Sequence, residues 1–175
     1  MASEVKTGFE IAFYFLNKAE INSDHLQPQK LQRLLFLAQT YYIIGYDRAL
    51  MPAVFIADER GPMEPNLFAA FSRGKPEIDV DTFLSDEIKN YLDAIWRRFG
   101  QINVEKLNNI SKNSEAYQRA LKRGIRSEIT HDEMRESFNK TPNLSLGLSK
   151  DKQKLMRNQT GKTVKVTAWS PKKTL

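Results

Sequence analysis

The sequence predicts a mainly α protein: a compact helical domain with one short extended strand or hairpin element and a basic C-terminal tail. Three observations lead to this fold class. Apolar residues recur at three- and four-residue spacing in several segments, which is typical of amphipathic helices around a common core. One short run, residues 53–57, is branched and aromatic and therefore favours an extended strand. After residue 138 the chain becomes polar and rich in lysine.

The helical spacing indicates seven helices. The first is predicted within residues 3–19. If Thr7 and Glu10 form a capping box, this helix begins at Gly8. The others are predicted at residues 27–45, 65–73, 83–99, 103–111, 115–122 and 130–138. Ser85 or Thr82, Ser114 and Thr130 are candidate N-caps, because a short hydroxyl side chain can accept a hydrogen bond from the first helical turn.

The helix at residues 27–45 has the clearest pattern. Its apolar stripe consists of Leu31, Leu34, Leu35, Ala38, Tyr41 and Tyr42. Pro28 suits the first turn, where its missing N–H costs nothing, and Gly45 is the predicted end. Lys30, Arg33 and Gln39 lie largely off the stripe.

A strand and a turn follow this helix. Pro52 and the charged residues 58–60 limit the strand to residues 53–57, and Gly61-Pro62 predicts a turn. In the helix that begins at Pro65, we expect Phe68 and Phe71 to point inward.

The charge distribution divides the chain into a domain, residues 1–138, and a basic tail, residues 139–175. The whole chain carries +6, but the tail alone contains eight Lys, one Arg and one Asp, a net charge of +8. The first 138 residues therefore carry −2. Within the tail, residues 163–169 alternate in polarity and predict a strand, which needs a sheet edge or a partner because an isolated strand is not stable.

The sequence lacks the common catalytic patterns. There is no cysteine, no Gly-x-Ser-x-Gly and no complete phosphate-binding loop. Gly161-Lys162-Thr163 is similar to the end of such a loop, but Met156 stands where the upstream glycine is needed. The two histidines share no metal-type spacing with carboxylates. We therefore expect a protein that is not an enzyme and that binds no cofactor or metal.

The expected location is the cytoplasm. The N-terminal residues lack the basic and long apolar regions of a signal peptide, and no apolar run approaches the roughly 20 residues that span a bilayer. Membrane binding is not expected.

Residues 27–71 also resemble the Panacea domain family, described as phage-associated, SocA-like antitoxins. The helix segment KLQRLLFLAQ, at residues 30–39, is followed by Tyr42 and Gly45, then by the extended run and by RGPMEPNLFAAF at residues 60–71. The likeness extends over roughly residues 5–138. Two features depart from the family: Arg60 replaces the usual aromatic before Gly-Pro, and a Thr-His segment followed by Pro-Trp is missing near residues 110–117.

The resemblance implies a protein that binds and neutralises a toxin protein, and that in the characterised type delivers the toxin to a host protease as an adaptor. The expected contact residues are the turn and parts of the tail, together with one tyrosine: Arg60, Gly61, Pro62, Met63, Glu64, Tyr117, Lys154, Arg157, Lys162, Lys165 and Trp169. A tight turn at residues 61–62 and core packing of Tyr117 are the structural alternatives. The functional alternative is a nucleic-acid-binding or phage-assembly protein, because tail lysines can neutralise phosphates and Trp169 can stack on a base.

Overall fold

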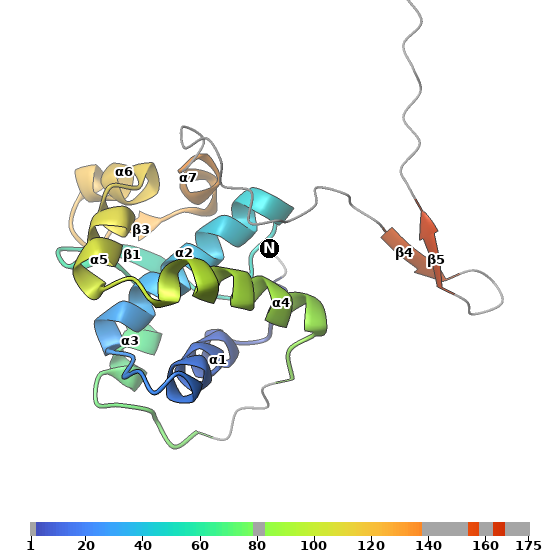
Figure 1. The fold of residues 1–175 in the computed structure, drawn as a ribbon. Coiled ribbons are helices and arrows are strands. Elements are labelled where there is room, and N and C mark those ends of the chain that lie inside the picture. Colours follow the sequence, from blue (N-terminus) through green and yellow to red (C-terminus); the bar gives the residue numbers. More distant parts are fainter. Residues whose placement is uncertain (1–2, 79–82, 138–153, 158–162, 167–175) are drawn as a thin grey trace, which may run out of the picture.

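The computed structural model describes residues 3–78, 83–137, 154–157 and 163–166, the last two ranges as backbone (Figure 1). The mainly α fold class is confirmed. The helices are α1 (Gly8–Ile21), α2 (Pro28–Tyr46), α3 (Pro65–Phe71), α4 (Asp86–Ile95), a π-helical turn η1 (Trp96–Gly100), α5 (Val104–Lys112), α6 (Glu115–Arg123) and α7 (His131–Glu136). The strands are β1 (Phe55–Asp58), β2 (Gly61–Met63), β3 (Glu128–Ile129), β4 (Lys154–Arg157) and β5 (Thr163–Val166).

Helix α2 is the centre of the fold. It packs against α1, α3, α4, α5 and α7 and against strand β2, and it runs through the middle of the helical body (Figure 1). Every residue from 31 to 43 is buried. A helix enclosed on all sides buries its polar residues as well, so Arg33 and Gln39 are buried although they lie off the apolar stripe.

The buried Gln39 is satisfied by the main chain. Its Nε2–H donates to the Met51 carbonyl oxygen at 3.2 Å, and the Met51 N–H donates to its Oε1 at 3.0 Å. The side-chain amide thus pairs with one residue as a neighbouring strand would, and it fixes the segment that leads into β1. A polar group so deep in the core is tolerated because both of its hydrogen-bonding ends are used.

Helix ends follow the capping chemistry of the sequence with one correction. The Thr7 N–H donates to Glu10 and α1 begins at Gly8, as predicted. Ser85, Ser114 and Thr130 cap α4, α6 and α7 through their side-chain oxygens. Helix α2 continues past Gly45 and ends where Asp47 adopts the left-handed conformation, which a short polar side chain tolerates.

The sheet has three antiparallel strands in the order β2-β1-β3. Asp58 pairs with Gly61, so β1 and β2 form a hairpin whose two-residue turn is Glu59-Arg60. The predicted turn at Gly61-Pro62 is therefore wrong by two residues: both belong to β2. Strand β3 pairs Ile129 with Phe55 and was not predicted, because two residues are too few to show an alternating pattern.

Two further predictions, one on packing and one on the bounds of a helix, differ from the structure. In α3 the buried apolar residues are Leu67 and Phe71, whereas Phe68 is half-buried. The predicted helix at residues 83–99 is shorter: α4 begins at Asp86 and continues into η1. At its end, a Cβ on Gly100 would lie 2.5 Å from the Trp96 ring, so this close approach requires glycine.

In the tail, β4 and β5 form an antiparallel hairpin in which Lys154 pairs with Val166 and Arg157 with Thr163. The first four residues of the strand predicted at 163–169 thus form β5, and the strand meets its need for an edge by pairing with β4. The last three residues of that prediction lie outside the described part of the chain.

Candidate protein-binding site

The β1–β2 hairpin carries the five residues predicted as the contact turn, and they differ in accessibility. Arg60 is exposed at the tip and Met63 is half-buried. Gly61, Pro62 and Glu64 are buried against α2. Only part of the predicted contact turn is therefore open to a partner, and the rest of it builds the hairpin.

Arg33 of α2 binds the main chain of the hairpin. Its side chain is 2% exposed, and its guanidinium donates from Nη1 to the Pro62 carbonyl oxygen, from Nη2 to the Arg60 carbonyl oxygen, and from Nε to Asn108 Oδ1 at 2.7 Å. Two of these acceptors are main-chain carbonyls of the hairpin. Arg33 thus joins α2 and α5 to the segment around β2.

The charge on Arg33 is unusual for its surroundings. Among the described residues, no carboxylate forms an ion pair with it. Burial lowers the pKa of the Arg33 guanidinium to about 10, opposed by the electrostatic influence of Tyr117 and Asp58. The group remains charged at neutral pH, and it is stabilised by carbonyl and amide oxygens rather than by a paired anion.

Gly61 is required by the position of Arg33. It has φ +122°, and a Cβ there would lie 2.9 Å from both Cζ and Nη2 of Arg33. A side chain at position 61 would therefore overlap the guanidinium. The positive φ directly after the hairpin turn and the close packing on a buried cation therefore both favour glycine here.

Glu64 connects the hairpin to α3. Its carboxylate accepts from the Leu67 N–H at 2.5 Å and from Asn66 Nδ2 at 3.1 Å, so it is the N-cap of α3. Its own N–H donates to Gln32 Oε1 at 2.9 Å. These contacts use both carboxylate oxygens inside the protein.

A pocket of about 120 Å³, called here the Arg33 pocket, opens between α2, the hairpin and α3. The residues that line it are Gln29, Gln32, Arg33, Asp58, Arg60, Gly61, Met63 and Phe68. Gln32 is 2% exposed, and among the described residues its Nε2 has no hydrogen-bond partner. The pocket therefore combines a buried cation, an unused amide donor and two apolar walls.

Tyr117 lies on α6, which packs against β1 of the hairpin. It is 1% exposed, and its hydroxyl donates to the Asp58 carbonyl oxygen at 2.8 Å, at the end of β1. Burial raises the pKa of the Tyr117 phenol, while Arg33 opposes this and Asp58 adds to it. Its observed position fits the core-packing alternative, with a role in holding the strand end.

The structure brings six of the predicted site residues, 60–64 and Tyr117, to one hairpin. Lys154, Arg157 and Lys165 belong to the tail hairpin, whose side chains are not described, and Lys162 and Trp169 lie outside the described residues. Sequence reasoning missed Gln32 and Arg33. One signal was present, because Arg33 is the single charged residue between positions 31 and 43 of this helix.

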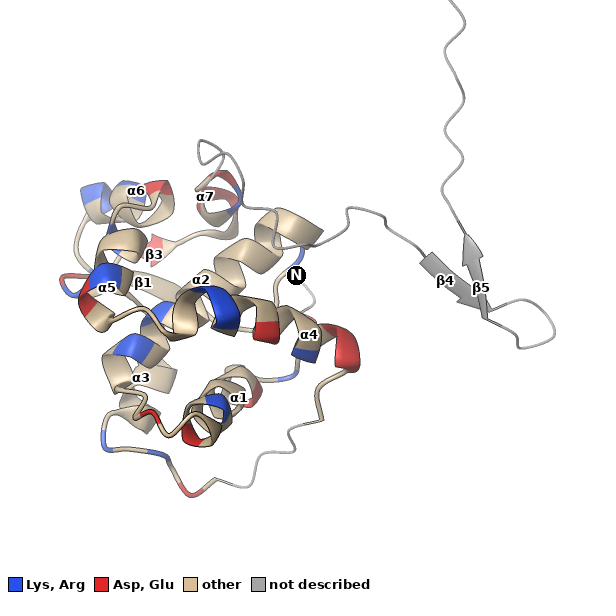
Figure 2. Cartoon of the chain, viewed as in Figure 1, with Lys and Arg blue, Asp and Glu red and all other residues tan. Residues whose placement is uncertain are grey.

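The rest of the surface is less distinctive. A larger hollow of about 490 Å³ lies between the end of α1, the start of α2 and the loop after α3. Basic and acidic residues are interspersed over the described helices (Figure 2).

Within the described ranges, no three His, Asp or Glu side chains gather as metal ligands. None of the helices there has the length and apolar composition to cross a membrane.

Comparisons with protein families, curated proteins and solved structures found no match for this chain.

Proposed function

We propose that this protein is a non-enzymatic protein-binding module of the antitoxin type, which binds and neutralises a toxin protein and delivers it to a host protease. The proposal includes a cytoplasmic location and an origin on a phage or another mobile element. It starts from the resemblance of residues 27–71 to the Panacea domain family.

One structural observation supports the proposal. The segments that carry the resemblance, α2, the β1–β2 hairpin and α3, form a single connected unit rather than separate elements. Arg33 and Gln32 on α2 bind main-chain groups of residues 60, 62 and 64. Such a unit presents an exposed arginine and a half-buried methionine on a rigid base, as a preorganised binding surface requires.

The second candidate function is nucleic-acid or phage-assembly binding through the basic tail. The observation that favours it is the concentration of charge: the tail carries +8 whereas the first 138 residues carry −2. Counterion release would make such binding steeply dependent on salt.

The two functions are separated by affinity capture from the native host with the tagged full chain. The lysate is treated with nuclease, the resin is washed at moderate salt, and captured proteins are identified by mass spectrometry. We expect one small protein in stoichiometric amount. Expressed alone it should arrest growth, and co-expression of this chain should restore growth.

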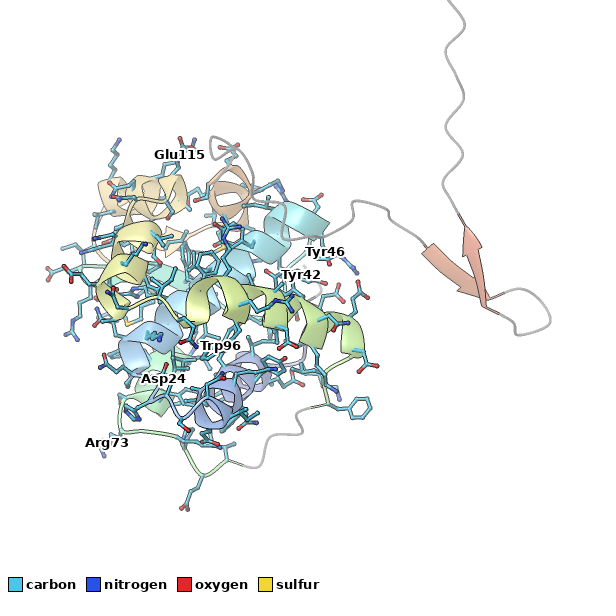
Figure 3. All side chains as sticks on the ribbon, in the orientation of Figure 1. Asp24, Tyr42, Tyr46, Arg73, Trp96 and Glu115 are labelled. Carbon is cyan, nitrogen blue, oxygen red and sulfur yellow. The ribbon has the colours of Figure 1, made fainter. Side chains whose placement is uncertain are left out.

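A charge reversal tests the hairpin. Arg60→Glu should weaken capture at least about tenfold, because a central arginine in an interface commonly contributes more than 1.4 kcal/mol. Arg73→Glu is the matched control, since Arg73 is also exposed but lies on the loop after α3 (Figure 3). Equal weakening by both variants would argue against the hairpin. Capture that disappears with nuclease or salt would favour the nucleic-acid function.

A further inference from the structure

The Arg33 pocket has more hydrogen-bond donors than the protein uses. A guanidinium has five N–H groups, and three of those on Arg33 have acceptors: the carbonyls of residues 60 and 62 and the Asn108 amide oxygen. The Gln32 amide accepts from the Glu64 N–H through Oε1. Its two Nε2–H donors have no acceptor among the described residues. Two N–H groups of Arg33 and two of Gln32 therefore have no acceptor among the described residues.

The charge of the site favours an anion. Arg33 is buried without a paired carboxylate, and Arg60 at the rim adds a second positive charge. Asp58 is the acidic residue of the lining, and its Oδ1 already accepts from the Arg60 N–H at 3.1 Å. An anion that enters would gain charge-assisted hydrogen bonds that the protein itself does not supply.

Size and wall chemistry narrow the class of anion. A volume of about 120 Å³ is small beside the roughly 300–1,000 Å³ of ordinary small-molecule pockets. We therefore expect a short group, such as a carboxylate with one or two methylene groups, rather than a nucleotide. The half-buried side chains of Met63 and Phe68 offer apolar walls to such a short stem. A carboxylate also matches the donors, because its two oxygens accept about four hydrogen bonds in one plane.

We propose that the Arg33 pocket binds a carboxylate presented by a partner protein, either an acidic side chain or the C-terminal carboxylate. The anion lies against the Arg33 guanidinium and the Gln32 amide, with its methylene groups between Met63 and Phe68. The assignment of the carboxylate to a protein rests on the proposed function. The binding of a carboxylate rests on the pocket alone, so the two can fail separately.

The test is an NMR titration of the full chain, which follows the side-chain Nε–H of Arg33 and the Nε2–H₂ of Gln32. The probes are acetate, N-acetylalanine as a chain terminus and N-acetylglutamate α-amide as an acidic side chain. Acetamide is the neutral control and inorganic phosphate is the competing anion. We expect saturable shifts of both side chains with a dissociation constant of roughly 1 mM for at least one carboxylate, and none with acetamide.

A near-isosteric variant tests the amide donor. Gln32→Glu keeps the oxygen that accepts from Glu64 and replaces the free donor by a negative charge. It should weaken carboxylate binding at least tenfold. Gln101→Glu, an exposed position outside the pocket lining, should leave binding unchanged. If Gln32→Glu is poorly folded, the wild-type titration decides the question.

Each outcome has a defined meaning. Binding of N-acetylalanine alone identifies a chain terminus, and binding of the glutamate derivative alone identifies an acidic side chain; either supports the pocket. Three results overturn the proposal: no saturable shift with any carboxylate, equal shifts with acetamide, or saturable binding of phosphate but not of carboxylates. Undiminished binding to a folded Gln32→Glu variant would also overturn it. Failure to capture a toxin would leave carboxylate binding intact and count against the proposed function only.

Discussion

The guanidinium of Arg33 and the backbone of Gly61 are in direct contact, so close that a Cβ on Gly61 would come within 2.9 Å of Arg33 Cζ. The contact joins the central helix to the hairpin and leaves room for no side chain at this position. The Gly-Pro dipeptide, which the sequence suggests as a turn, is thus a strand segment shaped around a buried cation.

Gly61→Ala should be strongly destabilising. A side chain at φ +122° costs about 1–3 kcal/mol, and the overlap with the guanidinium adds about 1–3 kcal/mol. Gly74→Ala is the matched control, because Gly74 also has positive φ (+111°) but a Cβ there meets nothing within 4 Å. Urea unfolding of both variants isolates the overlap. Equal losses of unfolding free energy would contradict the Arg33 contact.

Tyr117→Phe should lower the unfolding free energy by about 1 kcal/mol, because it removes the hydrogen bond to the Asp58 carbonyl oxygen and keeps the ring. Tyr46→Phe removes a hydroxyl for which no hydrogen bond is found within the described residues, so it should change stability by less than about 0.5 kcal/mol. Thermal or urea unfolding measures both. Equal effects would show that the hydroxyl of Tyr117 does not stabilise the strand end.

Glu133 should make the last helix sensitive to acid. The hydrogen bond from Arg123, aided by bonds from Thr130 and opposed by burial, lowers the pKa of Glu133 from its usual value near 4.5. A carboxyl group whose pKa is lowered by folding stabilises the folded state at any pH above its pKa in the unfolded chain. This stabilisation is lost as the pH falls through the pKa of the folded protein. Glu133→Gln should lower the unfolding free energy by about 1 kcal/mol at neutral pH, as loss of a capping contact does. The unfolding free energy of this variant should also fall less steeply as the pH is lowered.

The control for this prediction is Glu136→Gln. Glu136 is exposed and pairs with Arg119 on the surface, so its loss should matter by less than about 0.5 kcal/mol. Unfolding free energies from pH 7 to pH 3 give the comparison. If the unfolding free energy of the two variants falls equally with pH, Glu133 does not make the last helix sensitive to acid.

The six tyrosines should resist ionisation until the protein unfolds. Burial raises the pKa of all six, that of Tyr41 to about 12. Tyr42 and Tyr46 stack at 4.4 Å between ring centroids (Figure 3), and Tyr91 donates to the Ala38 carbonyl oxygen at 2.6 Å. Because the unfolded chain ionises near pH 10, stability is full below that pH and falls as the pH rises above it.

Near-ultraviolet absorbance and far-ultraviolet circular dichroism, recorded over the same alkaline titration, test this. Tyrosinate should appear together with the loss of helix. A full rise of tyrosinate absorbance near pH 10 with the helices intact would contradict the buried positions.

The sequence predicts helices well because each has an apolar stripe and several have a capping side chain. Ser85, Ser114 and Thr130 mark their helices correctly, and Leu84, Ile88 and Leu92 mark the buried face around α4. These features are local. Strand β3 could not be predicted, because it exists only through pairing with Phe55 and Ile56, more than seventy residues earlier.

Only part of the candidate site can be predicted from the sequence. The Arg-Gly-Pro segment is conspicuous in the sequence and does form the hairpin beside the pocket. The floor of the pocket was missed because Arg33 falls off the apolar stripe, and amphipathic reasoning sends such a residue to solvent. That reasoning fails for a helix covered on every side, where a polar residue is buried and must find acceptors in its neighbours.

The order of the strands in the sheet has a consequence for synthesis of the protein on the ribosome. Strand β1 lies in the middle and gains β2 at once, but its other neighbour begins at Glu128, 72 residues after Ile56. At about 5–20 residues per second, that edge stays open for about 4–14 s after β1 is made. A nascent chain therefore exposes an unpaired strand edge for several seconds, a window in which a chaperone or a second chain can pair with it.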